Sequence, residues 1–121
     1  MKESGEMYLE SIYLLCKAKD SVRSIDIVEH MNYSKPSISR AVHSLKNDGY
    51  ILLDKDGYIT LTELGLKTAE SIFERHTVLT NTLISLGVDE ETASEDACRM
   101  EHIISETTLN AMKKYLEKTE A

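Results

Sequence analysis

Residues 34–49, SKPSISRAVHSLKNDG, decide the fold of this chain. Pro36 suits the first position of a helix, because its fixed φ is already helical and its missing N–H would have no partner there. Ile38, Val42 and Leu45 then recur at i, i+4 and i+7, which places them on one buried face. Gly49 can take the left-handed conformation that ends a helix. The stretch therefore predicts a short helix with one apolar face.

The opposite face of this predicted helix is polar. Hydroxyls lie near its start, at Ser37 and Ser39, and basic side chains follow at Arg40, His43 and Lys46. Such a face can contact the phosphates and base edges of DNA, although the same residues also suit a face that is merely solvated.

A shorter helix is predicted just before it. Ser24 can cap this helix, and Ile25, Val28 and Met31 are expected to face inward. Residues 32–35, NYSK, form the turn between the two helices. Two short helices joined by a tight turn, the second with a polar outer face, are typical of a helix-turn-helix.

A predicted hairpin follows directly. Residues 50–53, YILL, and residues 58–61, YITL, are β-rich runs on either side of DKDG at 54–57. An Asp-Gly turn between two such runs favours a hairpin, and a hairpin after a helix-turn-helix is a wing. We therefore predict a winged helix-turn-helix, with Lys55 of the wing placed to contact phosphate.

A longer helix is predicted before the helix-turn-helix, and another after the wing. Ser4 is predicted to cap the first, which runs to about Lys19, and Thr62 to cap a helix that continues to Leu86 and is closed by Gly87. A helix of about 24 residues spans about 36 Å, which suits a connector between two lobes.

Two further helices are predicted, one from Asp89 to about Ile104 and one after Ser105. Their apolar stripe is too thin to close a core alone, and pairing with a second copy would supply the missing surface. The predicted fold is mainly α, with a winged helix-turn-helix in residues 1–62. Residues 63–121 would form the connector helix and a helical, metal-binding dimerisation domain.

The charge of the chain is unevenly distributed. Of the net −7, residues 1–21 carry 3 basic and 4 acidic side chains (−1), residues 22–60 carry 5 and 5 (0), and residues 61–121 carry 6 and 12 (−6). The neutral middle permits contact with nucleic acid, whereas the acidic half can attract cations. No apolar run approaches a membrane span or a signal peptide, and two cysteines make no disulfide framework, so we expect a cytoplasmic protein.

Candidate metal donors lie at both ends of the chain. Cys98, Glu101 and His102 sit at i, i+3 and i+4, so a helix would place a thiol, a carboxylate and an imidazole on one face. Met7 and Glu10 repeat the i, i+3 spacing in the first helix. These are suitable donors for a divalent transition metal. The alternative is structural: a half-buried Cys beside an exposed Glu-His pair, Met7 in the core and Glu10 in solvent.

His76 lies inside the apolar stripe of the long helix. At such a position a core histidine and a metal ligand are both reasonable interpretations.

Several separated segments carry a family resemblance. EMYLESIY at 6–13, LTELG at 61–65, Arg75-His76 and DACRMEH at 96–102 occur in order. With the winged helix between them, they resemble the diphtheria toxin repressor and manganese transport regulator family over essentially the whole chain. The resemblance implies a dimeric, metal-activated transcriptional repressor of metal-uptake genes. The chain looks like the short form, without the SH3-like domain of longer members.

The resemblance also implies a ligand set. Met7, Cys98, Glu101 and His102 match activating-metal positions of the iron-type branch, His76 matches a ligand of both branches, and Glu10 matches a carboxylate of the manganese-type branch. Thr80 and Ser94 stand where the iron-type ancillary site has Glu and His, so a complete ancillary site of that kind is not expected.

The sulfur donors bear on the choice of metal. Thioether and thiolate ligands favour Fe(II) over Mn(II), whereas Zn(II), Co(II) or Ni(II) would bind in vitro by raw affinity. We therefore expect Fe(II) to be preferred over Mn(II).

The predicted function is that of a repressor, not an enzyme: no phosphate loop, nucleophile motif or substrate pocket is visible, and no small-molecule substrate is expected. Its expected partners are palindromic double-stranded operator DNA and a second copy of the chain. A winged-helix regulator that is constitutive, or that answers a non-metal ligand, is the alternative. The residues expected to contact DNA are Lys35, Pro36, Ser37, Ser39, Arg40, His43, Lys46 and Lys55.

Overall fold

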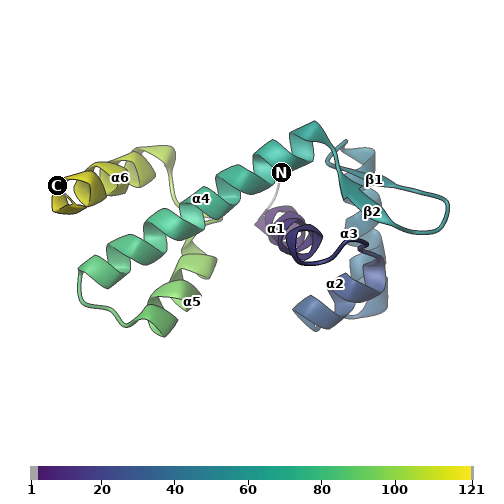
Figure 1. Cartoon of the computed structure of the whole chain (residues 1–121), viewed down its shortest axis with the longest axis horizontal. Helices are drawn as coiled ribbons and strands as arrows, with labels where there is room; N and C mark the ends of the chain where they lie inside the picture. The colour runs from purple at the N-terminus through teal and green to yellow at the C-terminus, as the bar shows by residue number, and fades with distance from the viewer. Residues whose placement is uncertain (1–2, 121) are drawn as a thin grey trace. The chain divides into compact units, whose positions relative to one another are not determined.

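The computed structural model describes residues 3–120, and its elements follow the predicted order (Figure 1). The mainly α winged-helix class predicted from the sequence is confirmed. No helix among the described residues combines the length and apolar composition needed to cross a membrane. The elements are α1 (Glu3–Ala18), α2 (Ser24–Met31), α3 (Lys35–Asn47), β1 (Ile51–Leu53), β2 (Ile59–Leu61), α4 (Glu63–Ser85), α5 (Glu90–Met100) and α6 (Glu106–Glu120).

The chain divides into two compact units, Met1–Glu70 and Ser71–Ala121. The division falls inside α4, so this one helix contributes its start to the first unit and the remainder to the second. The domain border predicted from the sequence, after residue 62, lies at the beginning of the same helix.

In the first unit, α1, α2 and α3 pack together and against the hairpin. The inward face predicted for α3 is confirmed, because Ile38, Val42 and Leu45 are all buried. The prediction for Ile25 is wrong: its exposed fraction is 44%, whereas Ile27 is 1% exposed. The buried face of α2 is centred between Ile27 and Met31, and a 100° step per residue carries Ile25 away from it.

Two predicted helix caps are also wrong. Ser4 lies inside α1, which already includes Glu3, and Ser24 is the first residue of α2. Arg23 precedes α2 in an extended conformation, and its backbone N–H donates to the carboxylate of Asp26 at 2.8 Å. The acidic side chain in the first turn therefore closes this helix start.

Helix α3 begins one residue before Pro36. Ser34 is its cap, and the Ser34 Oγ accepts a hydrogen bond from the backbone N–H of Ser37 at 3.3 Å. Beyond the helix end, Gly49 has a φ of 85°, the left-handed conformation predicted for it.

The wing is an antiparallel pair with the register Ile51↔Leu61, Leu52↔Thr60 and Leu53↔Ile59. At its tip, the Asp54 Oδ1 accepts hydrogen bonds from the backbone N–H groups of Asp56 and Tyr58, both at 2.9 Å. Gly57 completes the turn with a φ of 87°.

The LTELG segment fixes the start of α4 against the wing. The Thr62 Oγ1 accepts from the backbone N–H of Gly65 at 3.0 Å and donates to the carbonyl of Gly49 at 2.7 Å. A Cβ on Gly65 would lie 1.9 Å from the carbonyl oxygen of Tyr50. Only glycine fits there, and the predicted Thr62 cap is confirmed.

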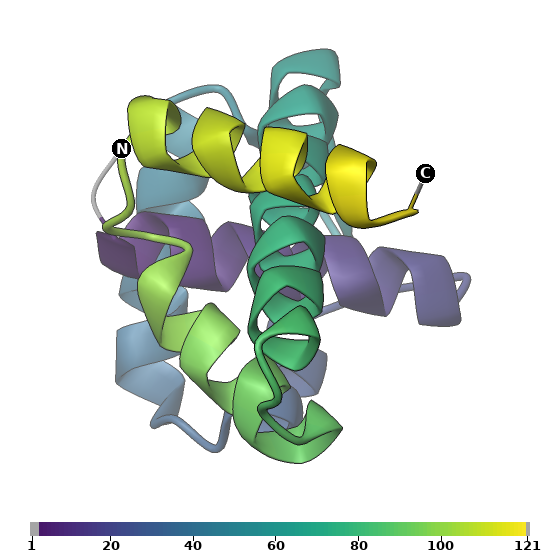
Figure 2. The same ribbon diagram turned by 90° about the vertical axis from the view of Figure 1, so that its left-hand side faces the viewer.

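In the second unit, α6 crosses α4 and α5 follows α4 through a tight turn closed by Gly87 (Figure 2). The helices predicted to open at Asp89 and after Ser105 are present, and both residues cap them. The Asp89 carboxylate accepts from the Thr92 N–H at 3.0 Å, and the Ser105 Oγ accepts from the Thr108 N–H at 3.2 Å. Among the described residues of this unit, the buried apolar ones are few, and two of them are alanines: Ile72, Leu79, Ala93, Ala97 and Leu109.

The helix that carries Cys98 is shorter than predicted. It ends at Met100 rather than near Ile104, and residues 101–103 form a turn. Glu101 still has right-handed helical angles, and its N–H donates to the carbonyl of Ala97. The helical spacing between Cys98 and Glu101 is therefore preserved, whereas His102 lies in the turn.

Candidate functional site

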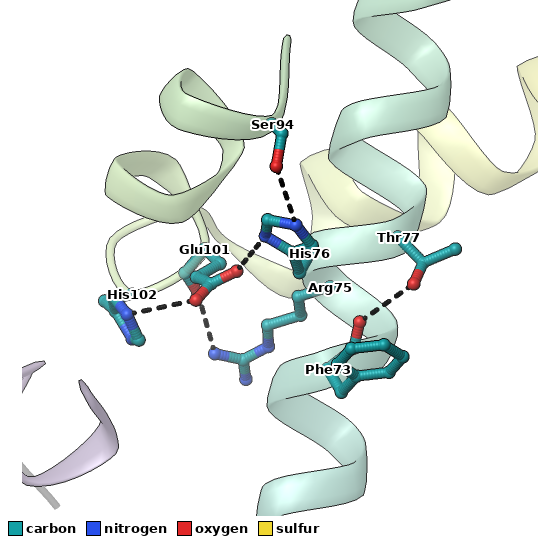
Figure 3. Close-up of polar contacts among 7 residues, drawn as sticks. All are labelled: Phe73, Arg75, His76, Thr77, Ser94, Glu101 and His102. Atoms are coloured by element: carbon teal, nitrogen blue, oxygen red, sulfur yellow. Dashed lines mark hydrogen bonds and ion pairs between the residues drawn. The ribbon is translucent and has the colours of Figure 1, made fainter. Parts of the chain in front are cut away.

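A buried carboxylate between two imidazoles forms the centre of the candidate site (Figure 3). The Glu101 side chain is 0% exposed, and its Oε2 lies 2.9 Å from the Nδ1 of His76 on α4. Its Oε1 lies 3.2 Å from the Nε2 of His102, whose side chain is 4% exposed. His76 and Glu101 are 25 positions apart in the chain, and the fold directs a ring nitrogen of one toward a carboxylate oxygen of the other.

Arg75 fixes the turn that presents Glu101 and His102. Its Nη1 donates to the backbone carbonyl of Glu101 at 3.3 Å, and its Nη2 lies 3.2 Å from the Glu106 carboxylate on α6. One half-buried guanidinium therefore ties α4 both to the end of α5 and to the start of α6. No role was predicted for Arg75 from the sequence. Its position next to His76, in an acidic part of the chain, could have indicated a structural ion pair.

The outer side of His76 contacts α5 and its own helix. The Ser94 Oγ lies 3.4 Å from His76 Nε2, and the Phe73 ring stacks on the imidazole with centroids 6.4 Å apart. Ser94 thus touches this histidine with a hydroxyl, where the iron-type pattern has an imidazole. Thr80, at the other departing position, has a buried hydroxyl without a hydrogen-bond partner among the described residues.

These groups have the chemistry of a metal site. An ionised carboxylate in a protein interior is costly unless cations or hydrogen-bond donors compensate it. Histidines supply that compensation as cations, or a divalent metal supplies it while the neutral rings act as ligands. The donor set of Glu101, His76 and His102 fits a divalent transition metal.

Cys98 belongs to the same cluster. It is exposed on the last turn of α5, three residues before Glu101, and its Sγ lies within 4.8 Å of a Glu101 carboxylate oxygen. Met7 and Glu10 are half-buried on α1, in the first unit, at the predicted i, i+3 spacing. The structure thus brings Cys98, His76 and His102 close to Glu101 within the second unit. Metal binding by Cys98, Met7 and Glu10 stays a prediction.

The residues expected to contact DNA lie on the outer face of α3 and on the wing. All are exposed except Ser37, which is half-buried. The Ser37 Oγ accepts from the Ser34 hydroxyl at 2.9 Å and from the Arg40 Nη2 at 3.4 Å. Ser37 therefore belongs to the cap of α3 and holds Arg40, and the exposed set is Lys35, Pro36, Ser39, Arg40, His43, Lys46 and Lys55.

A winged helix with a cationic recognition face, together with a buried carboxylate between two histidines, defines the class of metal-responsive DNA-binding regulators. Residues 1–59 match the iron dependent repressor N-terminal DNA-binding domain, and residues 62–121 match the iron dependent repressor metal-binding and dimerisation domain. The chain belongs to the iron-dependent repressor family, as its resemblance to the diphtheria toxin repressor and manganese transport regulator family predicted.

Named relatives are transcriptional regulators. The chain is 34% identical to a helix-turn-helix-type regulator of Methanocaldococcus jannaschii over 120 residues, covering 98% of this chain and 96% of that protein. It is 36% identical to the regulator MntR of Lysinibacillus sphaericus over 102 residues, covering 84% of this chain and 73% of that protein. It resembles the solved manganese regulator SloR with a TM-score of 0.81 and 28% identity, covering 93% of this chain and 53% of SloR. The chain thus spans about half of the length of that structure.

Proposed function

We propose that this chain is a metal-activated transcriptional repressor that binds palindromic operator DNA as a homodimer and controls metal-ion uptake genes. The observation that carries the proposal is the buried Glu101 between His76 and His102, inside a domain of the metal-binding type. Metal held there, and also by Cys98, Met7 and Glu10, would couple the second unit to the winged helix of the first.

The proposed physiological metal is Fe(II), in preference to Mn(II). The relative SloR is described as a manganese regulator, which favours Mn(II). The sulfur donors at Met7 and Cys98 favour the softer ion, and we give them more weight because they belong to this chain. Zn(II), Co(II) and Ni(II) are expected to substitute in vitro, because raw affinity follows the Irving–Williams order.

Homodimerisation through the second unit is supported by its exposed apolar side chains. Its small buried core leaves Ile103 68% exposed and Leu86 66% exposed. A second copy would cover such surface, and the matching domain model is described as a dimerisation domain.

On DNA, α3 is proposed to enter the major groove. Arg40, in the second turn of the helix, can donate two hydrogen bonds to guanine, and Ser39 can reach a base edge or phosphate. Lys35, Lys46 and Lys55 are proposed to contact phosphates.

The decisive experiment is an anaerobic DNA-binding titration after chelation. Selection from a random duplex pool, followed by fluorescence anisotropy, should show operator binding that appears on adding Fe(II) and, at higher concentration, Mn(II). The Glu101→Gln variant should show no metal response. Equal binding with and without metal would contradict the proposal and favour a constitutive regulator. A response to an organic ligand alone would favour the other alternative.

A further inference from the structure

A cationic cleft lies beside the recognition helix, within the first unit. Its volume is about 490 Å³, and it is bounded by the starts of α2 and α3 and by the turn of the wing. Ile25 and Val28 supply apolar surface to it, while Arg23, Lys35 and Ser39 supply polar groups. Among the described residues, none of those that line the cleft carries a carboxylate.

Arg23 is held in place by the wing. Its backbone forms an isolated antiparallel bridge with Tyr58, and its guanidinium carbon lies 5.2 Å from the centroid of the Tyr58 ring. The neighbouring wing residue is Gly57, where a Cβ would lie 3.5 Å from the Arg23 Nη2, an ordinary van der Waals distance. The turn of the wing therefore packs directly beside the guanidinium.

The charge of Arg23 is available to a ligand. Asp26, the nearby carboxylate, accepts from the Lys19 ammonium and from the backbone N–H of Arg23. Within residues 3–120, no carboxylate lies within ion-pair distance of the Arg23 guanidinium. Lys35, at the start of α3, adds a second exposed cation to the same cleft.

We propose that this cleft binds a phosphodiester of the DNA backbone, with Arg23 as the main anion-binding group and Tyr58 as its positioning residue. The proposal rests on the proposed DNA-binding function and adds a contact outside the recognition helix. A planar guanidinium matches the oxygens of a phosphate, and stacking on Tyr58 orients it before DNA arrives. The apolar surface of Ile25 and Val28 suits the adjoining sugar. Such contacts fix the register of a protein on duplex DNA without reading sequence.

The test compares Arg23→Met, which keeps a stem to cover Tyr58 without charge, with Arg23→Lys, which keeps the charge. Binding of the full chain is measured over a range of salt concentrations, on the selected operator with metal and on a random duplex with chelator. Arg23→Met should weaken both complexes and lower the salt slope by about one for each bound protomer, whereas Arg23→Lys should restore the slope. The ratio of wild-type to Arg23→Met affinity should then fall about threefold for each bound protomer when the salt rises from about 50 to about 200 mM. Lys114→Ala, which removes an exposed cation from the second unit, is the matched control.

Two further measurements separate the explanations. Tyr58→Leu should weaken binding in the wild-type background but have little effect in Arg23→Met, because the ring acts through the guanidinium. If Arg23→Met keeps the wild-type salt slope on both duplexes, the proposal is wrong. The random-duplex measurement needs no metal, so failure of metal activation alone would overturn the proposed function and leave this contact intact.

Discussion

Glu101 constrains the chemistry of the second unit more than any other described side chain. It is fully buried, and its two oxygens lie 2.9 and 3.2 Å from imidazole nitrogens, which are hydrogen-bonding distances. An ionised carboxylate in this setting is costly unless positive charge or hydrogen-bond donors compensate it. The divalent metal proposed to bind here would supply such charge, with the two imidazoles as further ligands.

Replacing Glu101 by Gln keeps its size and removes its charge. Metal affinity, measured by calorimetry with Mn(II), should fall by at least the factor of about 10 to 100 that loss of an outer-shell partner costs. Thermal unfolding should show the metal-free variant still folded. Glu117→Gln, which changes an exposed carboxylate on α6, is the control and should bind metal as the wild type does. Unchanged affinity in Glu101→Gln would show that the cluster is only structural.

Met7 offers a separate test of metal choice. Met7→Asp exchanges a soft thioether for a hard oxygen one helical turn from Glu10, so the response should shift toward Mn(II). The measurement is the ratio of Fe(II) to Mn(II) concentrations that give half-maximal operator binding, which should rise about tenfold if the donor change is worth about 1.4 kcal/mol. Ala18→Asp, which places an aspartate on the exposed last turn of α1, is the control. A constant ratio would mean that Met7 belongs to the core.

For single residues, the sequence predicted which side chains could bind metal better than it predicted which side chains contact one another. The spacing of Cys98, Glu101 and His102 indicated metal donors because helical geometry relates positions this close in the chain. The contacts of His76 with Ser94 and of Arg75 with the Glu101 carbonyl join residues 18 and 26 positions apart. Pairing over that distance depends on how α4, α5 and α6 pack, which a single sequence does not encode locally.

Among the elements, α3 combines a buried face with an exposed basic one. Its first turn is fixed by Ser34 and Pro36, and Ser37 holds the Arg40 guanidinium through a hydrogen bond. The backbone that carries the exposed side chains is therefore fixed at the start of α3. A fixed backbone favours specific contacts with DNA over adaptable ones.

Arg40 and Lys46 are predicted to act differently on DNA. Arg40→Ala should cost about 1–3 kcal/mol at the operator and relax selection at one base pair in each half-site. Lys46→Ala should weaken all sequences similarly and lower the salt slope by about one for each bound protomer. Binding-site selection on both variants checks this. If Arg40→Ala retains the wild-type preferred sequence, its assignment to a base is wrong.

The cap of α5 predicts a pH dependence. Hydrogen bonds from the backbone N–H and side chain of Thr92 lower the pKa of Asp89. Because the folded-state pKa lies below that of the unfolded chain, this stabilisation is present above about pH 4 and is lost as the pH falls through the folded-state value. Asp89→Asn also caps but does not titrate, so it should reduce the acid dependence of the urea midpoint while preserving stability at pH 7. Glu91→Gln is the control, and an unchanged acid slope in Asp89→Asn would contradict the assignment.

Element type and order could be predicted because their signals are local: Pro36, Gly49, the Asp-Gly turn and the Thr62 cap. The errors also have local causes. The short α2 spans only about two turns, so periodicity alone did not separate Ile25 from Ile27. The end of α5 at Met100 was missed because the sequence shows neither Gly nor Pro there.

At the scale of the whole molecule, charge and apolar surface are divided between the two units. The acidic excess lies in residues 61–121, and the cationic recognition face lies on α3. The exposed Leu86 and Ile103 belong to the second unit. This division suits a protein in which one unit contacts DNA while the other binds cations and a second copy. How metal changes DNA affinity is then a question of linkage between the units.

Linkage makes a reciprocal prediction. If metal donors come from both units, as proposed, metal favours the arrangement that binds DNA, and operator DNA must tighten metal binding by the same factor. We expect a coupling free energy of about 1–3 kcal/mol, equivalent to about 5- to 150-fold in affinity. Calorimetric Mn(II) titrations of the chain alone, with operator and with a scrambled duplex would measure it. A Met7→Leu, Glu10→Gln double variant keeps His76, Glu101 and His102 but should lose the coupling. Equal metal affinities with and without operator in the wild type would show that the metal does not connect the two units.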